Sequence, residues 1–298
     1  MTTQRARLAA TALLVLLTAV WGSTFFLIRD LVATLAPADF LAVRFAIAAV
    51  LMVVLFWRPL RALRRREVAA AAGLGGFYGV AQILQTVGLE HTDASVSGFV
   101  TGTYVVLTPL FSAVLLRERI GAPTWAAVLL ATAGLAVLSL RGMSVGPGES
   151  LTFGAAALYA LHIVGLGRYS TPARATGMSV VQMLVIALIC GGAAAPGGIE
   201  LPHDGGQWAV VLYMTGAASI LALWAQTWAQ ARLTATRTAI VMTLEPVFAA
   251  GFAVAFGGES LTGRMLLGGT LVLAAMYLVE LLARRPDRVD PEALHHTA

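Results

Sequence analysis

The stretch MTLEPVFAAGF, residues 242–252, places a carboxylate beside a proline in the middle of a long apolar run. Glu245 introduces a charge and Pro246 removes a backbone N–H, and neither belongs in an ordinary apolar helix. A proline inside a helix also leaves the carbonyl four residues before it, here that of Met242, without its usual donor. Two interpretations remain open at this point. Either Glu245 and Pro246 line a polar interior, or they only shape and lock the helix that carries them.

The composition around this stretch excludes a soluble globular protein. Of the 298 residues, 58% are hydrophobic and only 12% are charged, and the mean hydropathy is +0.82. So few charges cannot cover a water-exposed surface, and we therefore predict that a lipid bilayer solvates most of the chain. The single cysteine, Cys190, excludes an intrachain disulfide and a cysteine-based zinc site. No metal or other cofactor is expected.

Apolar runs of about 20 residues, the length that crosses the hydrocarbon of a bilayer, recur along the whole chain. We predict an all-α membrane protein with ten transmembrane helices. The first run follows Arg5 and Arg7 as a signal peptide would, but it lacks a convincing cleavage site and precedes nine similar runs, so we retain it as a helix. The predicted runs are 8–28, 38–57, 68–88, 95–116, 122–140, 150–168, 176–195, 207–230, 238–257 and 263–283.

The arginines are distributed unequally between the two sides that ten crossings create. Sixteen fall on the side of the N-terminus, three fall on the opposite side, and Arg44 lies within the second run. Cytoplasmic loops of membrane proteins carry an excess of basic residues. The bias therefore predicts a multi-pass protein of the inner membrane with both termini in the cytoplasm. It also accounts for the net charge of +5 without a nucleic-acid partner.

Two segments of the chain repeat each other at a fixed spacing. LQTVGLEHTDAS and AQTWAQARLTAT share a Gln-Thr pair, and Gln85 and Glu118 are 33 residues apart, as are Gln226 and Glu259. One offset of 141 residues thus joins the two halves. Because each half holds five helices, an odd number, the second half enters the membrane from the opposite side. We predict two inverted five-helix repeats, residues 1–141 and 148–284, and a disordered cytoplasmic tail at 285–298.

The same offset places Glu245 opposite Tyr104, in the fourth run. The two repeats are therefore predicted to present a carboxylate and a phenol at equivalent depth on opposite sides of one centre. The prolines do not superpose, since Pro109 falls on Ala250, about one turn from Pro246. We predict that both prolines break their helices and take part in gating.

Three pieces of the sequence carry a family resemblance: WGSTFF at 21–26, the arginine in LAVRFAIAAV, and LEPVFAAGFAVAFGGESLTGRMLLGGTLVLAA near the C-terminus. They resemble the drug/metabolite transporter superfamily, specifically its EamA-type branch with two five-helix repeats. The resemblance covers nearly the whole chain and implies a permease. Members of this branch export amino acids and related metabolites, and they also move other compounds. The second half departs from the pattern, with LYALHIVGLG in place of a Trp-Gly signature and no arginine in its second helix.

Polar side chains inside the apolar runs are the candidates for a substrate cavity. Tyr78, Gln82 and Gln85 follow one another at i, i+4 and i+7, which places them on one helical face, and Gln226 and Gln230 share a face of the eighth run. Such stripes cannot face lipid cheaply. They either line a cavity or join helices, and we predict that they line a cavity.

The other polar candidates keep several interpretations. Arg44 lies near the outer end of its run, where it would extend to the surface, pair with an acidic residue or contact a substrate carboxylate. His162 would be either hydrogen-bonded packing or part of a proton relay. Trp21 and Gly22 would permit close approach of two helices, with gating as the alternative.

The sequence contains no G-x-x-x-x-G-K-[ST], H-E-x-x-H or G-x-S-x-G motif. We therefore predict no catalytic residue and a secondary active transporter that exports a small polar metabolite, such as an amino acid or derivative, by alternating access. Proton coupling through Glu245 is a hypothesis. The first four helices of each repeat would form the site, and the fifth would buttress it or form a homodimer. Uptake or exchange of a sugar-, nucleotide- or vitamin-like solute, a passive facilitator and an intramembrane enzyme remain as alternatives.

Overall fold

The computed structural model describes residues 3–92, 94–117, 119–139, 146–256 and 261–284, and these contain helices and turns but no strand. The tail predicted at 285–298, together with Glu118 and Glu259, lies outside the described residues. The helices in chain order are α1 (Thr3–Gly22), α2 (Thr24–Val32), α3 (Pro37–Arg61), α4 (Arg65–Leu89), α5 (Ala94–Gly102), α6 (Tyr104–Leu115), α7 (Ala122–Ser139), α8 (Pro147–Tyr169), α9 (Ala175–Ala194), the short 3-10 helix η1 (Ala195–Gly197), α10 (Gly205–Tyr213), the π-helical segment η2 (Met214–Leu221), α11 (Ala222–Gln230), α12 (Ala235–Met242), α13 (Leu244–Ala255) and α14 (Gly263–Arg284).

Six helical stretches among the described residues are long and apolar enough to cross a membrane. Four of the ten predicted runs, 95–116, 122–140, 238–257 and 263–283, are not among these six stretches. The chain is therefore all-helical, with six clear spans and further short apolar helices. The six spans are Gln4–Val32, Pro37–Arg61, Arg65–Leu89, Pro147–Tyr169, Ala175–Gly197 and Gly205–Gln230, and the shorter apolar helices include Val100–Leu115, Ala122–Gly134 and Leu266–Ala275.

Three helical runs are interrupted at a single hydroxyl-bearing residue. The side chains of Ser23, Thr103 and Thr243 each donate a hydrogen bond to the carbonyl three residues earlier, at 2.7, 2.6 and 2.6 Å. A serine or threonine that takes a carbonyl in this way competes with the helical bond and bends the helix. These residues lie at the breaks between α1 and α2, between α5 and α6, and between α12 and α13.

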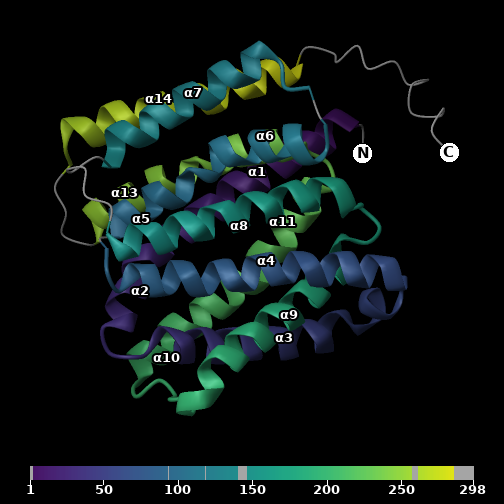
Figure 1. Cartoon of the computed structure of the whole chain (residues 1–298), viewed down its shortest axis with the longest axis vertical. Coiled ribbons are helices and arrows are strands. Elements are labelled where there is room, and N and C mark those ends of the chain that lie inside the picture. Colours follow the sequence, from purple (N-terminus) through teal and green to yellow (C-terminus); the bar gives the residue numbers. More distant parts are fainter. Residues whose placement is uncertain (1–2, 93, 118, 140–145, 257–260, 285–298) are drawn as a thin grey trace.

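The helices lie side by side as one bundle (Figure 1). The pair of α7 and α14 forms one edge of the bundle, and α3 with α9 lies toward the opposite edge. Between these edges α4 packs on α8 and α9, α6 packs on α8 and α12, and α1 packs on α11, α12 and α13. The long apolar helices thus enclose a core, and this arrangement leaves α7 and α14 away from the centre of the bundle.

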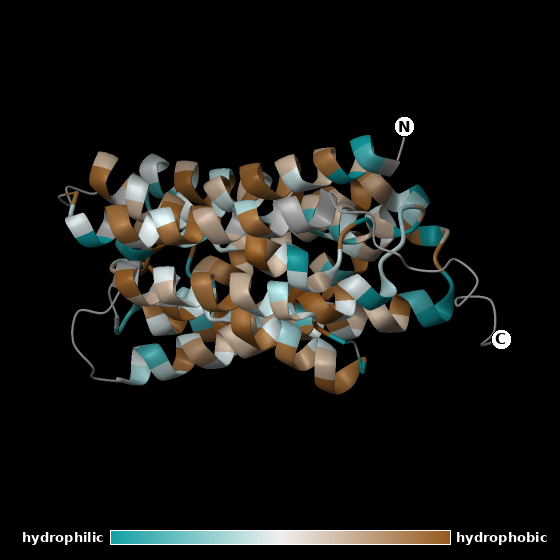
Figure 2. Ribbon diagram, turned by 90° about the horizontal axis from the view of Figure 1, so that it is seen from above, coloured by the Kyte–Doolittle hydropathy of each residue, from teal (hydrophilic) through white to brown (hydrophobic). Residues whose placement is uncertain are grey.

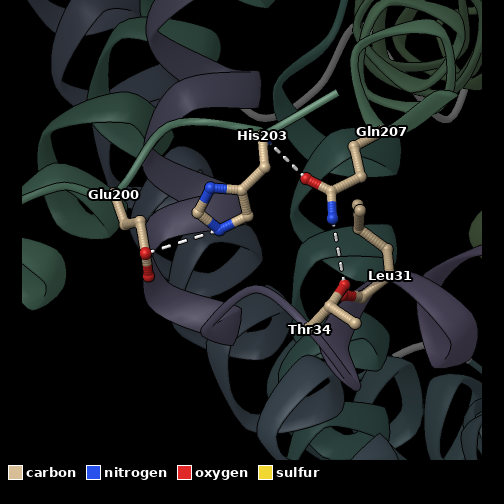
Figure 3. A network of polar contacts seen from close by, with 5 residues as sticks. All are labelled: Leu31, Thr34, Glu200, His203 and Gln207. Atoms are coloured by element: carbon tan, nitrogen blue, oxygen red, sulfur yellow. Dashed lines mark hydrogen bonds and ion pairs between the residues drawn. The ribbon is translucent and has the colours of Figure 1, made fainter. Parts of the chain in front are cut away.

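Polar contacts fasten the two ends of the bundle. At one end Arg174 donates to the carbonyl of Ala62 at 2.7 Å and pairs with Glu67 at 3.3 Å. At the other end Gln207 donates to Thr34 at 3.1 Å and accepts from the backbone N–H of His203 at 2.7 Å (Figure 3). Hydrophobic residues predominate along the helices, and hydrophilic ones gather toward the ends (Figure 2). This distribution fits a bundle whose middle lies in hydrocarbon.

Candidate functional site

A cavity of about 50 Å³ lies among the central helices. This volume holds a few water molecules and is much smaller than the roughly 300–1,000 Å³ of a typical ligand pocket. None of its lining residues comes from α7, α9 or α14. The residues that line it are Trp21, Thr24, Phe25, Ile28, Arg44, Tyr78, Gln82, Gln85, Leu89, Thr101, Tyr104, Tyr159, His162, Ile163, Gln226, Met242 and Glu245.

Most of the polar residues singled out in the sequence meet at this cavity. Those that line it are Glu245, Tyr104, Tyr78, Gln82, Gln85, Gln226, His162, Arg44 and Trp21. Four others do not: Gln230, Gly22, Pro109 and Pro246. The polar stripe on α4 faces inward as its spacing predicts, because residues at i, i+4 and i+7 share one helical face.

Tyr159, which the sequence did not single out as a site residue, organises the polar wall formed by α4. Its hydroxyl accepts a hydrogen bond from Gln82 at 2.5 Å and donates to Gln85 at 2.9 Å. Gln85 in turn donates to the hydroxyl of Thr101 at 2.9 Å. These bonds join α4, α8 and α5 around the cavity. The signal for Tyr159 was its place one turn before His162, on the same face of α8.

His162 is bound into the core through α9. Its Nε2 lies 2.8 Å from Oε1 of Gln182, and since an amide oxygen can only accept, Nε2 carries the hydrogen. Gln182 completes its bonds by donating to the carbonyl of Met178 at 3.3 Å and to the hydroxyl of Thr227 at 3.4 Å. On the cavity side the imidazole packs edge-on against the ring of Tyr78, with centroids 5.1 Å apart. His162 therefore serves to pack α8 against α9, through the hydrogen bond that its Nε2 donates to Gln182.

The proline beside Glu245 has the consequence that the sequence predicted, and a partner that it did not predict. Pro246 leaves the carbonyl of Met242 without a helical donor, and the hydroxyl of Tyr104 donates to that carbonyl at 2.8 Å. The same hydroxyl lies 3.5 Å from Oε2 of Glu245, at the limit of a hydrogen bond. Because it has one hydrogen to give, the bond to Met242 is the stronger of the two.

The helix breaks lie ahead of the prolines. Pro246 is the third residue of α13, and the break at Thr243 precedes it, next to the carbonyl that the proline frees. Pro109 lies inside α6, while the break is at Thr103, six residues earlier. The break before α6 therefore lies at Thr103 and not at the proline.

Arg44 is buried, with only 3% of its surface exposed, and so does not extend to the bundle surface. Its Nε donates to the hydroxyl of Ser219 at 2.7 Å, and its Nη2 donates to the carbonyl of Ala218 at 3.3 Å. Trp21 donates to that carbonyl as well, at 3.1 Å. Both acceptors lie in the π-helical segment η2, a kind of helix that is frequent at functional sites. The rings of Phe45 and Phe40 lie 4.8 and 5.6 Å from the guanidinium carbon.

The remaining candidates pack helices together. Gln230 accepts from Gln226 at 3.2 Å and donates to the carbonyl of Ile163 at 2.8 Å, which joins α11 to α8 beside the cavity. A Cβ atom at Gly22 would lie 2.7 Å from Cβ of Phe248, closer than real Cβ atoms approach. Gly22 therefore allows the contact between α1 and α13 that the sequence suggested. Among the described residues, no group of three or more His, Cys, Asp or Glu side chains gathers that could hold a metal.

The EamA-like transporter family matches this chain at residues 9–140 and again at 146–281. The chain belongs to the EamA-like transporter family. This membership confirms the resemblance carried by WGSTFF and the Glu-Pro stretch. The family and the helical bundle with its apolar spans together identify a multi-pass membrane transporter of the drug/metabolite transporter type.

Two relatives and one solved structure resemble the chain over nearly its full length. An uncharacterized transporter of Archaeoglobus fulgidus is 30% identical over 276 residues, which is 92% of this chain and 87% of the relative. The uncharacterized transporter YyaM of Bacillus subtilis is 23% identical over 290 residues, 89% and 91% of the two chains. A solved crystal structure of a protein superposes with a TM-score of 0.75 at 19% identity, covering 93% of this chain and 98% of the other. That likeness concerns the fold alone.

Proposed function

We propose that the protein is a secondary active transporter of the inner membrane that exports a small polar metabolite, such as an amino acid or derivative, by alternating access. In this proposal the chain crosses the bilayer ten times, as two inverted five-helix repeats. The first repeat consists of α1–α2, α3, α4, α5–α6 and α7, and the second consists of α8, α9, α10–η2–α11, α12–α13 and α14.

The helix contacts support two repeats related by a two-fold axis. Two contacts join a helix to its counterpart in the other half: α3 to α9, and α7 to α14. The packing of α6 on α12 is matched by that of α13 on α5. Other contacts occur in matched pairs. The packing of α1 on α12 and α13 corresponds to that of α8 on α5 and α6, and the packing of α4 on α8 corresponds to that of α11 on α1. Exchanging the halves therefore reproduces these contacts, as an inverted repeat requires.

The observation that carries the proposal is the way in which the two halves share the cavity. Four pairs of lining residues are each separated by 141 residues, the offset that joins the repeated Gln-Thr pairs. A substrate site at the interface of two inverted repeats is built in this way, because the axis that relates the halves passes through it. The pairs are Trp21 with His162, Gln85 with Gln226, Thr101 with Met242, and Tyr104 with Glu245.

Glu245 provides the means of coupling to a proton gradient. It is 7% exposed and is the one carboxylate among the described residues that lines the cavity. Acidic residues within membrane spans occur along proton pathways of pumps and transporters. A carboxyl that is reached alternately from the two sides would carry a proton in exchange for the substrate. No nucleotide-binding motif occurs in the sequence.

The size of the cavity supports alternating access over a permanent channel. A cavity of about 50 Å³ is much smaller than a typical ligand pocket, so the helices around it must separate before most metabolites can enter. The three interrupted helical runs contribute lining residues on both sides of their breaks or next to them, such as Tyr104 after Thr103 and Met242 before Thr243. Discontinuous helices around a central site are a feature of secondary transporters.

The orientation of the protein follows from its arginines. The turn between α3 and α4 and the turn between α8 and α9 lie together at one end, where Arg174 contacts Ala62 and Glu67. Arg61 and Arg64 belong to the turn between α3 and α4. The start of α1 lies toward the same end (Figure 1). By the positive-inside rule this end faces the cytoplasm, together with both termini.

The experiment that tests the proposal measures solute flux through the purified protein in proteoliposomes under a pH gradient. The substrate is first found by a metabolite panel, as efflux from cells that overproduce the protein. We expect Glu245→Gln to abolish pH-driven flux while folding, followed by helical circular dichroism and a monodisperse elution profile, stays intact. Glu200→Gln, which changes an exposed carboxylate in the loop before α10, is the matched control and should keep full flux. Undiminished flux in Glu245→Gln would refute proton coupling through this residue.

A further inference from the structure

Arg44 is a buried cation without an acidic partner. The ion pairs that the structure gives among the described residues are those of Arg174 with Glu67 and of His203 with Glu200, and neither involves Arg44. Neither Asp39, on the same helix, nor Glu245, which lines the same cavity, pairs with Arg44. An uncompensated charge at this depth is costly, because removing an ion from water is repaid only by an opposite charge or by a full set of hydrogen bonds.

The hydrogen bonds of Arg44 involve only two of the three guanidinium nitrogens. Nε is held by Ser219 and Nη2 by Ala218, whereas Nη1 has no hydrogen-bond acceptor in the described part of the chain. Ser219, which accepts from Nε, fixes the plane of the group. Arg44 also lines the cavity, so the free edge of the group is available to a molecule that enters it. A guanidinium held in this way is preorganised for an anion.

We propose that Arg44 is the anion-binding subsite of the cavity and that it takes the carboxylate of the substrate. The proposal rests on the transport function above and specifies its cargo: the solute carries one carboxylate, which excludes neutral sugars and simple amines. The cavity holds one buried cation and one buried acid, Glu245, among the described residues that line it. A singly charged carboxylate or a zwitterion suits this pair, while a phosphate dianion would be repelled by an ionised Glu245.

Acetate is the probe for this subsite, because it is a small carboxylate. Acetamide has the same shape but no charge, and it serves as the neutral comparison. Binding of acetate, acetamide and glycine to the purified full-length protein is measured by ligand-observed NMR at matched ionic strength. We expect acetate and glycine to bind at least about tenfold more tightly than acetamide, since the charge-assisted bond to Arg44 is available only to them.

The variants then assign this preference to Arg44. Arg44→Gln should bind acetate and acetamide equally, and Arg44→Lys should keep part of the preference because it keeps the charge. Arg29→Gln, an exposed arginine on α2, is the matched control and should behave as the natural sequence does. Equal binding of acetate and acetamide by the natural sequence would overturn the proposal, as would a preference that survives in Arg44→Gln. The first comparison needs no variant, so it holds even if Arg44→Gln does not fold.

The outcome is separable from that of the transport proposal. Acetate binding through Arg44 in a protein that moves no solute across proteoliposomes would overturn the transport function and leave the anion subsite standing. Flux of carboxylate-free solutes, without any preference for acetate, would overturn the anion subsite and leave transport standing.

Discussion

Two groups of helices lie around the cavity or directly behind its lining: the first-half wall of α1, α3 and α4, and the second-half wall of α8, α9 and α11. The two walls differ in how their helices are held together, although one offset relates their residues. In the second half, buried hydrogen bonds connect α8, α9 and α11. In the first half, three of the four equivalent positions carry apolar side chains. The second-half residues are His162, Gln182, Thr227 and Gln230, and their counterparts 141 positions earlier are Trp21, Leu41, Thr86 and Leu89.

This difference teaches that equivalent positions in a repeat need not be held by the same forces. Hydrogen bonds are directional, and a buried donor that loses its partner is left at a cost of about 1–3 kcal/mol. Apolar contacts are not directional and tolerate sliding. The hydrogen bonds that α1, α3 and α4 make with other helices run outside this group, as from Trp21 to Ala218 and from Gln82 to Tyr159. We therefore expect α8, α9 and α11 to move as one unit when the cavity widens, while α1, α3 and α4 separate from one another more easily.

The largest loss of stability is expected at Gly22, where α1 packs closely against α13. In Gly22→Val the new Cβ would lie within 3.0 Å of Cβ of Phe248, the backbone N of Ala249 and the carbonyl oxygen of Glu245. Two of these atoms belong to the backbone and cannot turn aside, so α1 must move away from α13. We expect a loss of about 3 kcal/mol or more in the free energy of unfolding, measured by denaturant titration in detergent micelles.

The control for this prediction is a glycine with open space around it. A Cβ at Gly73 would meet nothing within 4 Å, so Gly73→Val should change stability by less than about 1 kcal/mol. The position equivalent to Gly22 in the second half is Ile163, which shows that the requirement for glycine belongs to one wall only. If Gly22→Val and Gly73→Val were equally stable, the close crossing of α1 and α13 would be refuted.

The second largest loss of stability is expected at Gln182, in the hydrogen-bonded wall of α8, α9 and α11. In Gln182→Leu the Nε2 hydrogen of His162 loses its acceptor while the size of the side chain changes little. We expect a loss of about 2 kcal/mol in unfolding free energy, within the range for an orphaned buried donor. Leu41→Gln places an amide at the equivalent position of the first half, among apolar neighbours, and should be destabilising as well. If Gln182→Leu did not lower the unfolding free energy, the proposed difference between the two walls would be wrong.

The sequence predicted the parts of this structure that depend on local pattern. The apolar runs predicted helices. The spacing of Tyr78, Gln82 and Gln85 predicted that they share one helical face, and in the structure all three line the cavity. The Glu-Pro pair marked a central position because a charge and a missing donor have few uses in an apolar helix. Each of these inferences needs only the neighbours along one helix.

Contacts between helices could not be read from the sequence in the same way. The bond from Tyr104 to Met242 depends on the register between α6 and α12, and that of Arg44 with Ser219 depends on the π-helical segment η2. The sequence does not mark Tyr159 as a site residue, because a tyrosine in an apolar helix commonly serves only in packing. The proline pattern predicts a break at Pro109, whereas the break lies at Thr103, six residues earlier, because threonine is common in helices and does not mark a break in the sequence.

The smallest effect is expected at the contact that joins the two broken helices. Tyr104→Phe removes the hydroxyl that donates to Met242 and lies near Glu245, and leaves the ring in place. Hydrogen bonds between membrane helices contribute modestly, so we expect about 1 kcal/mol less stability. Tyr277→Phe, on an exposed face of α14, serves as the control and should have no effect.

The same variant also separates stability from transport. If Tyr104 only replaces the helical donor that Pro246 removes, Tyr104→Phe should lower stability and leave flux unchanged. If the phenol also positions Glu245, its equivalent in the other repeat, flux should fall by more than the small stability loss explains. Measuring stability and flux on one preparation decides whether Tyr104 serves packing alone. If Tyr104→Phe changed neither stability nor flux, the contact of Tyr104 with Met242 and Glu245 would have no role in either.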